Sequence, residues 1–484
     1  MSATFLIAAQ LGTAGILSSA LVWVFARQMR LGICLLLLPG LIGELTRQNE
    51  LGVDVGHLTF SLSDVVVACA AIVLIGRLVL RRIHVSLSVL ALGGLLALSA
   101  GSMFQGMAEF GLETAANECR PYAHFLIASL YIATAGAGVR TEILRFGAKA
   151  WCVLAVTYAL VCICRWWATG ITSANDYVID DGTLVTARPL FAAGALVICQ
   201  ATLLLITMRW QTLRCRILVG GLLLTVILLQ HRTVWIATAV AIVAYLLLGR
   251  AARTDRFSVA GAAVFTGVIA FIGLSLFSLG SVKEELLSSY SAMQGTHSTF
   301  AWRVTGWNEL LAEKATFQGT MFGRPFGTGY QRLIDGSLVT VSPHNFYVQT
   351  FLRLGITGIA LLFGLYLWTL LALRSGSRAD LLGRLILLTQ LTFCAAYSPS
   401  TEQGVALGLV LWQLSRTQSS GERRKPFIQR KLDENRTQTP LAKPYAHTHH
   451  VGDHRENGGP WQLTGLRTFE PEGEQHASDD HCAR

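Results

Sequence analysis

Two arginines and one histidine lie where apolar segments of the chain meet polar connections. Arg232 stands on a connection of only a few residues, Arg303 lies between Trp302 and Trp307 in a long polar stretch, and His344 directly precedes another apolar segment. The planar guanidinium of arginine matches phosphate oxygens in pairs. An imidazole that titrates near neutrality can accept a proton from a hydroxyl group. Together these residue types could bind a phosphate-bearing ligand and activate a sugar hydroxyl.

Each residue also has an interpretation without chemistry. Arg232 could anchor a helix end by extending its charge to the membrane surface. Arg303 could be a solvated residue on an amphipathic helix that lies on the membrane, and His344 could be an ordinary residue of the membrane interface. The sequence leaves these alternatives open.

A glycine-rich run supplies flexible backbone and a further cation between Arg303 and His344. It follows no predicted strand and lacks the lysine of a P-loop, so we do not expect a nucleotide site there. The run is Phe322-Gly323-Arg324-Pro325-Phe326-Gly327-Thr328-Gly329-Tyr330. Three arginines are weaker candidates for contacts with lipid or glycan: Arg120, Arg188 and Arg324. Aromatic rings nearby could stack on sugars, although membrane anchoring is their more common role: Trp302, Trp307 and Tyr330.

The elements that position these residues must cross a membrane. Of the 484 residues, 52% are hydrophobic and 14% are charged, against about 25% charged in soluble domains. The apolar residues form solid blocks, each about as long as the roughly 20 residues that span a bilayer. We therefore expect an all-α integral membrane protein, and the composition nearly excludes a soluble enzyme.

The apolar blocks predict a polytopic bundle of about 12–13 transmembrane helices. The blocks are 5–25, 31–45, 60–76, 85–103, 121–138, 147–167, 189–208, 217–231, 234–249, 258–280, 346–373, 383–397 and 402–415. The second block is short and contains Pro39, and the last two are separated by a few residues only, so these segments could instead be re-entrant.

The connections alternate in charge, which predicts the side of the membrane on which each lies. One set is basic and is expected in the cytoplasm by the positive-inside rule: Arg27 and Arg30, Arg77, Arg81 and Arg82, Arg140, Arg145 and Lys149, Arg209, Arg214 and Arg216, Arg250, Arg253 and Arg256, and Arg374, Arg378 and Arg384. The other set is acidic or mixed and includes the one long connection, 281–345, which is therefore expected outside. The net charge of +10 follows from this topology and does not indicate nucleic-acid binding. The N-terminus is then outside and the C-terminal tail inside.

We expect two parts, a membrane domain at 1–416 and a polar tail at 417–484. The tail has too little apolar content to fold alone, and the spacing of its histidines matches no standard set of metal ligands. The 10 cysteines form no CxxC pair and are interpreted as small core residues. We therefore predict no metal site. The first block lacks the basic start and cleavage site of a secretory signal and is expected to stay as a membrane helix.

The motifs above, taken in order, resemble those of the O-antigen ligase and polysaccharide polymerase superfamily of bacterial membrane proteins. The likeness covers about 5–416, and the order of the motifs relative to the spans makes it fairly specific. The motifs are Arg232-Thr233-Val234-Trp235, Arg303-(x)3-Trp307, the glycine-rich run, His344-Asn345-(x)9-Gly355-(x)2-Gly358, Ser61-Leu62-Ser63-Asp64 and Arg120-Pro121-Tyr122.

The resemblance implies a glycosyltransferase of the C type in the bacterial inner membrane. Its donor would be a glycan on undecaprenyl pyrophosphate, presented at the periplasmic face, and it would use neither a metal ion nor a nucleotide sugar. Arg232 and Arg303 match the positions that bind the pyrophosphate, and His344 matches the histidine that activates the acceptor hydroxyl. Asn345, beside that histidine, is expected to contact substrate. The chain departs from the family at Gln230-His231, where a small residue is common, and in its polar tail.

The favoured hypothesis is a polymerase of lipid-linked oligosaccharide units in exopolysaccharide or O-antigen biosynthesis. A ligase that transfers the glycan to lipid A core is the alternative, and the preference rests on the resemblance of the glycine-rich run. A flippase of the same lipid-linked unit is the rival from another class. Transporters place ionisable groups within their spans and often carry repeats, whereas here the charges are predicted at span ends, Arg232 excepted, and no repeat is visible. A non-catalytic scaffold among other polysaccharide assembly proteins is a third hypothesis.

Overall fold

The structure is a computed structural model and describes most of the chain up to residue 423. The described ranges are 17–47, 52–55, 58–80, 86–135, 142–170, 177–180, 183–186, 188–209, 212–248, 299–312, 316–334, 336–373 and 377–423. The chain divides into two compact units, Met1–Arg424 and Lys425–Arg484, and the second lies outside the described residues. The predicted tail, the predicted span 258–280 and the basic connections around Arg140 and Arg253 fall outside them as well.

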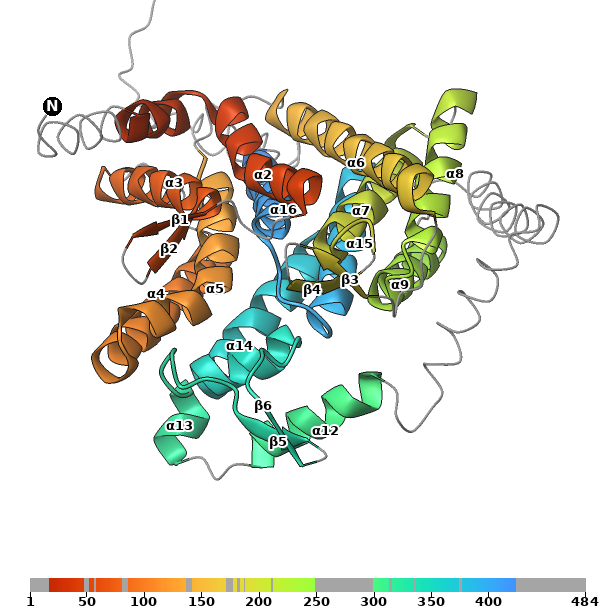
Figure 1. Cartoon of the computed structure of the whole chain (residues 1–484). Coiled ribbons are helices and arrows are strands. Elements are labelled where there is room, and N and C mark those ends of the chain that lie inside the picture. The colour runs from red at the N-terminus through yellow and green to blue at the C-terminus, as the bar shows by residue number, and fades with distance from the viewer. Residues whose placement is uncertain are drawn as a thin grey trace, which may run out of the picture. The chain divides into compact units, whose positions relative to one another are not determined.

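The protein is an all-α integral membrane protein, as the composition predicts (Figure 1). Its helices are Leu17–Arg27, α2 (Met29–Thr46), α3 (Leu62–Val79), α4 (Leu87–Phe110), α5 (Leu112–Ala133), α6 (Glu142–Thr169), α7 (Ala192–Arg209), α8 (Leu213–Leu228), α9 (Arg232–Leu248), α12 (Thr299–Ala312), α13 (Phe317–Phe322), α14 (Phe346–Ala372), α15 (Arg378–Cys394) and α16 (Thr401–Arg423). Five of them are long and apolar enough to cross a membrane, namely α2, α3, α4, α6 and α14.

Strands are confined, within the described residues, to three two-stranded antiparallel hairpins in the connections. They are β1 (Gly52–Val55) with β2 (Leu58–Ser61), β3 (Tyr177–Asp180) with β4 (Thr183–Thr186), and β5 (Arg332–Ile334) with β6 (Ser337–Val339). They lie in connections that are predicted to face outward, except that β2 extends into the first two residues of the predicted span 60–76.

The clearest correction to the predicted spans is α5, which begins at Leu112 rather than near Pro121. Glu118 and Arg120 are therefore helical and do not lie in a loop. Hydropathy places the boundary too late because both charges are neutralised by other elements: Arg353 pairs with Glu118, and Asp64 pairs with Arg120.

The segments that could have been re-entrant are helices of ordinary length. The block with Pro39 is the 18-residue helix α2, and the last two blocks are the 17-residue α15 and the 23-residue α16.

Helices α5 and α16 approach each other closely through small residues. A Cβ atom on Gly404 would lie 2.5 Å from the carbonyl oxygen of Phe125, and one on Gly408 would lie 2.8 Å from that of Ser129. The Ser129 hydroxyl also donates a hydrogen bond to the Gly404 carbonyl oxygen at 3.1 Å. Small residues four apart let membrane helices pack backbone to backbone, so this pair fixes the position of α5.

A buried polar network joins the helices that surround this pair. The amide of Gln200 on α7 donates to the side-chain oxygen of Gln403 on α16 at 2.8 Å, and Gln390 on α15 donates to the backbone oxygen of Gln403 at 2.8 Å. The Tyr366 hydroxyl on α14 donates to Gln390 at 3.1 Å. Hydrogen bonds of this kind hold helices together where no water is available.

Helix α14 consists of two segments that meet at Gly355. This residue has φ 63° and ψ −163°, a conformation that favours glycine. A Cβ atom at Gly355 would also collide with the backbone of Met321 at the end of α13. The short segment Phe346–Leu354 is therefore set apart from the remainder of α14, and α13 packs at the junction (Figure 1).

We predict that Gly404→Leu lowers the stability of the protein because the added side chain cannot enter the α5–α16 contact. Overpacking of this kind costs about 1–3 kcal/mol. Thermal unfolding of the detergent-solubilised protein measures the change. The control is Gly364→Leu on α14, where no atom lies within 4 Å of the position that an added Cβ would take. Equal unfolding temperatures for the two variants would contradict the close approach.

Candidate functional site

Three arginines from separate elements converge, and we call Arg188, Arg232 and Arg303 the arginine cluster. Arg188 lies just before α7, Arg232 is the first residue of α9, and Arg303 is on α12. The charges of Arg188 and Arg303 both act on the guanidinium of Arg232. The two strongest phosphate candidates from the sequence are thus brought together, and a weaker candidate, Arg188, joins them.

The arginine cluster lacks acidic partners within the described part of the chain, since none of its members forms a salt bridge there. The Nε atoms of Arg188 and Arg232 are buried and have no hydrogen-bond acceptor among the described residues. Like charges at short range repel, and a buried donor without an acceptor is costly. An anion bound among the three guanidinium groups would remove both penalties.

His231 positions Arg188 within the cluster. Its Nε2 lies 2.9 Å from the Leu190 carbonyl oxygen, and its Nδ1 lies 3.2 Å from Nη1 of Arg188. Burial and the charge of Arg188 lower the pKa of His231 to about 3. The ring is therefore neutral near pH 7, and it donates to Leu190 through Nε2 and accepts from Arg188 through Nδ1.

Tyr397, in the turn between α15 and α16, completes the surroundings of the cluster. The guanidinium carbon of Arg303 lies 5.7 Å from the centre of the Tyr397 ring, within the range of a cation–π contact. The phenol is also an electrostatic neighbour of Arg232. Tyr397 was not among the residues predicted from the sequence, although the predicted topology places this short turn on the outer side.

His344 lies beside the arginine cluster in the connection that leads into α14. The residue is exposed, and its backbone has a left-handed φ of 51°, which is uncommon for a residue other than glycine. Partial burial and the charges of Arg303 and Arg332 lower the pKa of His344. The side chain is therefore a neutral base over a wider range of pH than an ordinary histidine.

Backbone contacts from the outer connection hold the His344 loop in place. The indole N–H of Trp307 donates to the Pro343 carbonyl oxygen at 2.8 Å. Arg332 on β5 donates to the Tyr330 and Val341 carbonyl oxygens at 2.9 and 2.7 Å. Its guanidinium also lies 5.7 Å from the Trp302 ring. Trp307 thus holds the His344 loop through its indole N–H. Helix α12 and the β5–β6 hairpin contact each other, and together they position Arg303 and His344.

Other candidates from the sequence are engaged in contacts away from the cluster. Arg120 pairs with Asp64 at 3.1 Å and donates to the Thr59 carbonyl oxygen at 2.7 Å. Asn345 caps α14, because its side-chain oxygen accepts from the backbone N–H groups of Tyr347 and Val348. Tyr330 is buried with the Arg353 guanidinium over its ring at 4.4 Å, so we do not propose it as a sugar contact.

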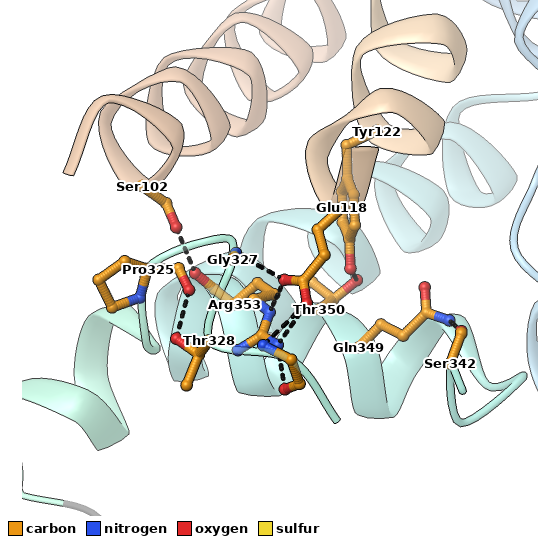
Figure 2. Close-up of polar contacts among 11 residues, drawn as sticks. Ser102, Glu118, Tyr122, Pro325, Gly327, Thr328, Ser342, Gln349, Thr350 and Arg353 are labelled. Atoms are coloured by element: carbon orange, nitrogen blue, oxygen red, sulfur yellow. Dashed lines mark hydrogen bonds and ion pairs between the residues drawn. The ribbon is translucent and has the colours of Figure 1, made fainter. Parts of the chain in front are cut away.

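The glycine-rich run is held by an ion pair between Glu118 on α5 and Arg353 on α14 (Figure 2). The atoms Arg353 Nε and Glu118 Oε2 are 2.8 Å apart, and the Arg353 side chain is 1% exposed. Glu118 also accepts from the backbone N–H groups of Gly327 and Gly329, each at 2.9 Å. Arg353 donates to the Gly329 carbonyl oxygen at 2.5 Å. One carboxylate and one guanidinium thus fix the backbone of the run on two helices.

This pair corrects the prediction that charges lie only at span ends. Arg353 is the eighth residue of α14, and the charge is tolerated because Glu118 and the Gly329 carbonyl oxygen satisfy it. A basic residue inside an apolar block was the sequence signal that could have revealed it.

The described residues contain no group of three histidine, cysteine or acidic side chains that could hold a metal ion. We therefore assign no metal site to them.

Comparison with known families identifies the part of the chain that carries most of the site. Residues 217–363 match the family described as O-antigen ligase, which is less than a third of the chain. The match includes Arg232, Arg303 and His344 and excludes Arg188 and Arg120. The match supports the likeness of this integral membrane protein to O-antigen ligases and polymerases, and it supports a function of that general type. No curated protein matches the chain.

We predict that Glu118→Ala strongly destabilises the protein. The variant leaves Arg353 buried without its partner, and breaking a buried pair costs about 3–5 kcal/mol. Unfolding in detergent measures the loss. The matched control is Glu109→Ala on the preceding helix, because Glu109 is exposed and bonds only locally to Gln105 within the described residues. If both variants unfold alike, the pair does not hold the run.

Proposed function

We propose that the protein is a glycosyltransferase that polymerises glycan units carried on undecaprenyl pyrophosphate at the periplasmic face of the bacterial inner membrane. The observation that supports this most is the arginine cluster without acidic partners in the described residues, with the neutral imidazole of His344 beside it. The match to the O-antigen ligase family over 217–363 supports the same reaction class.

The cluster suits a diphosphate leaving group. When the bond between the sugar and the pyrophosphate breaks, negative charge develops on a phosphate oxygen. Guanidinium groups that are already fixed by Arg188–His231 and Arg303–Tyr397 contacts stabilise that charge more in the transition state than in the ground state. In this proposal Arg232 and Arg303 bind the pyrophosphate, and Arg188 supports them.

His344 is the proposed general base. It would take the proton of the acceptor hydroxyl as this oxygen attacks the anomeric carbon of the donor sugar and the pyrophosphate lipid leaves. The low pKa keeps the imidazole neutral, so that it can accept this proton. Trp307 contributes by fixing the loop that carries His344.

We prefer a polymerase to a ligase that transfers the glycan to lipid A core. The preference rests on the likeness of the glycine-rich run to exopolysaccharide members of the superfamily. Purified protein given only lipid-linked units separates the two, since a polymerase yields a ladder of products and a ligase yields none without its acceptor.

Arg232→Ala, Arg303→Ala and His344→Ala are each expected to abolish product formation while the protein still inserts in the membrane. Loss of one donor at a developing oxyanion typically costs about 10²–10³ in rate. Product formation from lipid-linked units, measured on the purified variants, checks this. The control is Arg214→Ala, which removes an exposed arginine from the start of α8. Arg232 follows the other end of α8 and begins α9. Normal product formation by the His344→Ala protein would show that His344 is not the general base.

The rate should fall on acidification with a midpoint below about 6.5, the ordinary pKa of histidine. The direction follows because burial, Arg303 and Arg332 lower the pKa of His344 and because only the neutral ring accepts a proton. A pH profile of single-turnover rates measures the midpoint.

An independent measurement tests the cause of this shift. The rate of His344 modification by diethylpyrocarbonate, followed against pH by mass spectrometry, reports its pKa without turnover. Arg303→Gln removes a neighbouring positive charge and should move this pKa upward. A midpoint that stays in place in the variant would show that the two side chains do not interact.

A further inference from the structure

A groove of about 720 Å³ lies between α4, α13 and α14. Its walls come from one face of α4, from α13 with the first residues of the glycine-rich run, and from the part of α14 that follows Gly355. None of the arginine cluster residues or His344 lines it. The groove is therefore a separate feature from the candidate site.

The groove is polar at one end and apolar at the other. Ser102, Gln105 and Arg324 line the polar end. Two hydrogen bonds place this end beside the first segment of α14. The Ser102 hydroxyl donates to the Arg353 carbonyl oxygen at 3.2 Å, and the backbone N–H of Arg324 donates to the Leu352 carbonyl oxygen at 2.7 Å.

Gly94, Leu98 and Leu361 line the apolar end, where a Cβ on Gly94 would lie 3.4 Å from Leu361. From Gly94 to Gln105 the helix rises by about 16 Å. This gradient is complementary to an amphiphile with an anionic head and a long apolar tail.

Helices α4 and α13, which form walls of the groove, carry exposed apolar side chains. Phe317 and Phe322 of α13 are 81% and 55% exposed, and Phe104 of α4 is 67% exposed. In a protein that crosses a membrane, exposed aromatic rings face lipid or the interface. The groove therefore opens toward the bilayer, from which a lipid can enter.

We propose that this groove binds an isoprenoid lipid phosphate, with the phosphate at Arg324 and the isoprenoid chain between α4 and α14. Resting on the proposed function, we assign this lipid to the acceptor unit, while the donor diphosphate lies in the arginine cluster. The segment Phe346–Leu354 separates the two sites. Its nine helical residues extend over about 13 Å, and His344 lies two residues before them. A glycan on the acceptor lipid extends over this distance, so that its far hydroxyl reaches His344.

Two glycines of α4 provide a matched pair of variants for the test. Neither Gly93 nor Gly101 has an atom within 4 Å of an added Cβ, and only Gly101 lines the groove. Gly101→Leu therefore fills the groove without a backbone clash, and Gly93→Leu adds the same side chain elsewhere on the same helix.

Binding is measured by native mass spectrometry of the full chain in detergent, with an isoprenyl phosphate and the uncharged isoprenol of equal length as probes. All variants carry Arg232→Gln and Arg303→Gln, so that the arginine cluster contributes little. Gly101→Leu should weaken binding of both probes roughly tenfold, and Gly93→Leu should leave binding unchanged. Arg324→Gln should weaken binding of the phosphate but not of the isoprenol.

Equal binding by the Gly101→Leu and Gly93→Leu proteins would overturn the groove as a lipid site. Equal competition by phosphatidic acid would overturn the isoprenoid assignment, because the groove would then accept any anionic lipid. Neither result depends on product formation, so failure of the groove is distinguishable from failure of the proposed glycosyl transfer.

Discussion

The ion pair between Glu118 and Arg353 is the interaction on which the outer part of the structure depends. Two helices that are distant in sequence meet through it, and the carboxylate also binds the backbone of the glycine-rich run. The Arg353 side chain is 1% exposed and the Glu118 side chain 13% exposed, so each charge needs the other as its partner. The run in turn requires Gly323 next to Arg353 and Gly355 next to Met321, where a Cβ would collide with backbone. The break in α14 thus lies directly after Arg353, where α13 and the start of the run pack against this helix.

The break has a consequence for the chemistry. It separates Phe346–Leu354 from the apolar part of α14, and this short segment begins directly after His344. The imidazole is therefore carried by a segment that the Glu118–Arg353 pair fixes, while the guanidinium groups are carried by α9, α12 and the connection before α7. The site is assembled from elements that are each held by their own contacts, so its geometry exists before substrate binds.

Much of this arrangement was predictable from the sequence. Hydropathy is a property of whole segments, and so is the alternation of basic and acidic connections between them. They predicted the membrane class and most helices, and they predicted one side of the membrane for Arg232, Arg303 and His344, which the structure brings together. Charges neutralised across long sequence separations escaped prediction, since a single segment does not reveal its partner. The late start predicted for α5 and the unexpected Arg353 both result from this. The role of Asn345 as a helix cap was hidden for a related reason, because a short motif shows residue types and not their hydrogen bonds.

The departure from the family pattern at Gln230-His231 has a physical explanation. Gln230 adopts a left-handed φ of 56° and is buried, which lets the chain turn sharply between α8 and α9. His231 is then directed inward, where it bonds the Leu190 carbonyl oxygen and Arg188. A small residue would leave the Arg188 guanidinium without this acceptor and free to move away from Arg232, whose charge repels it. A neutral imidazole, kept neutral by its burial, holds two like charges side by side without adding a third. The larger residue at this position therefore makes Arg188 part of the site.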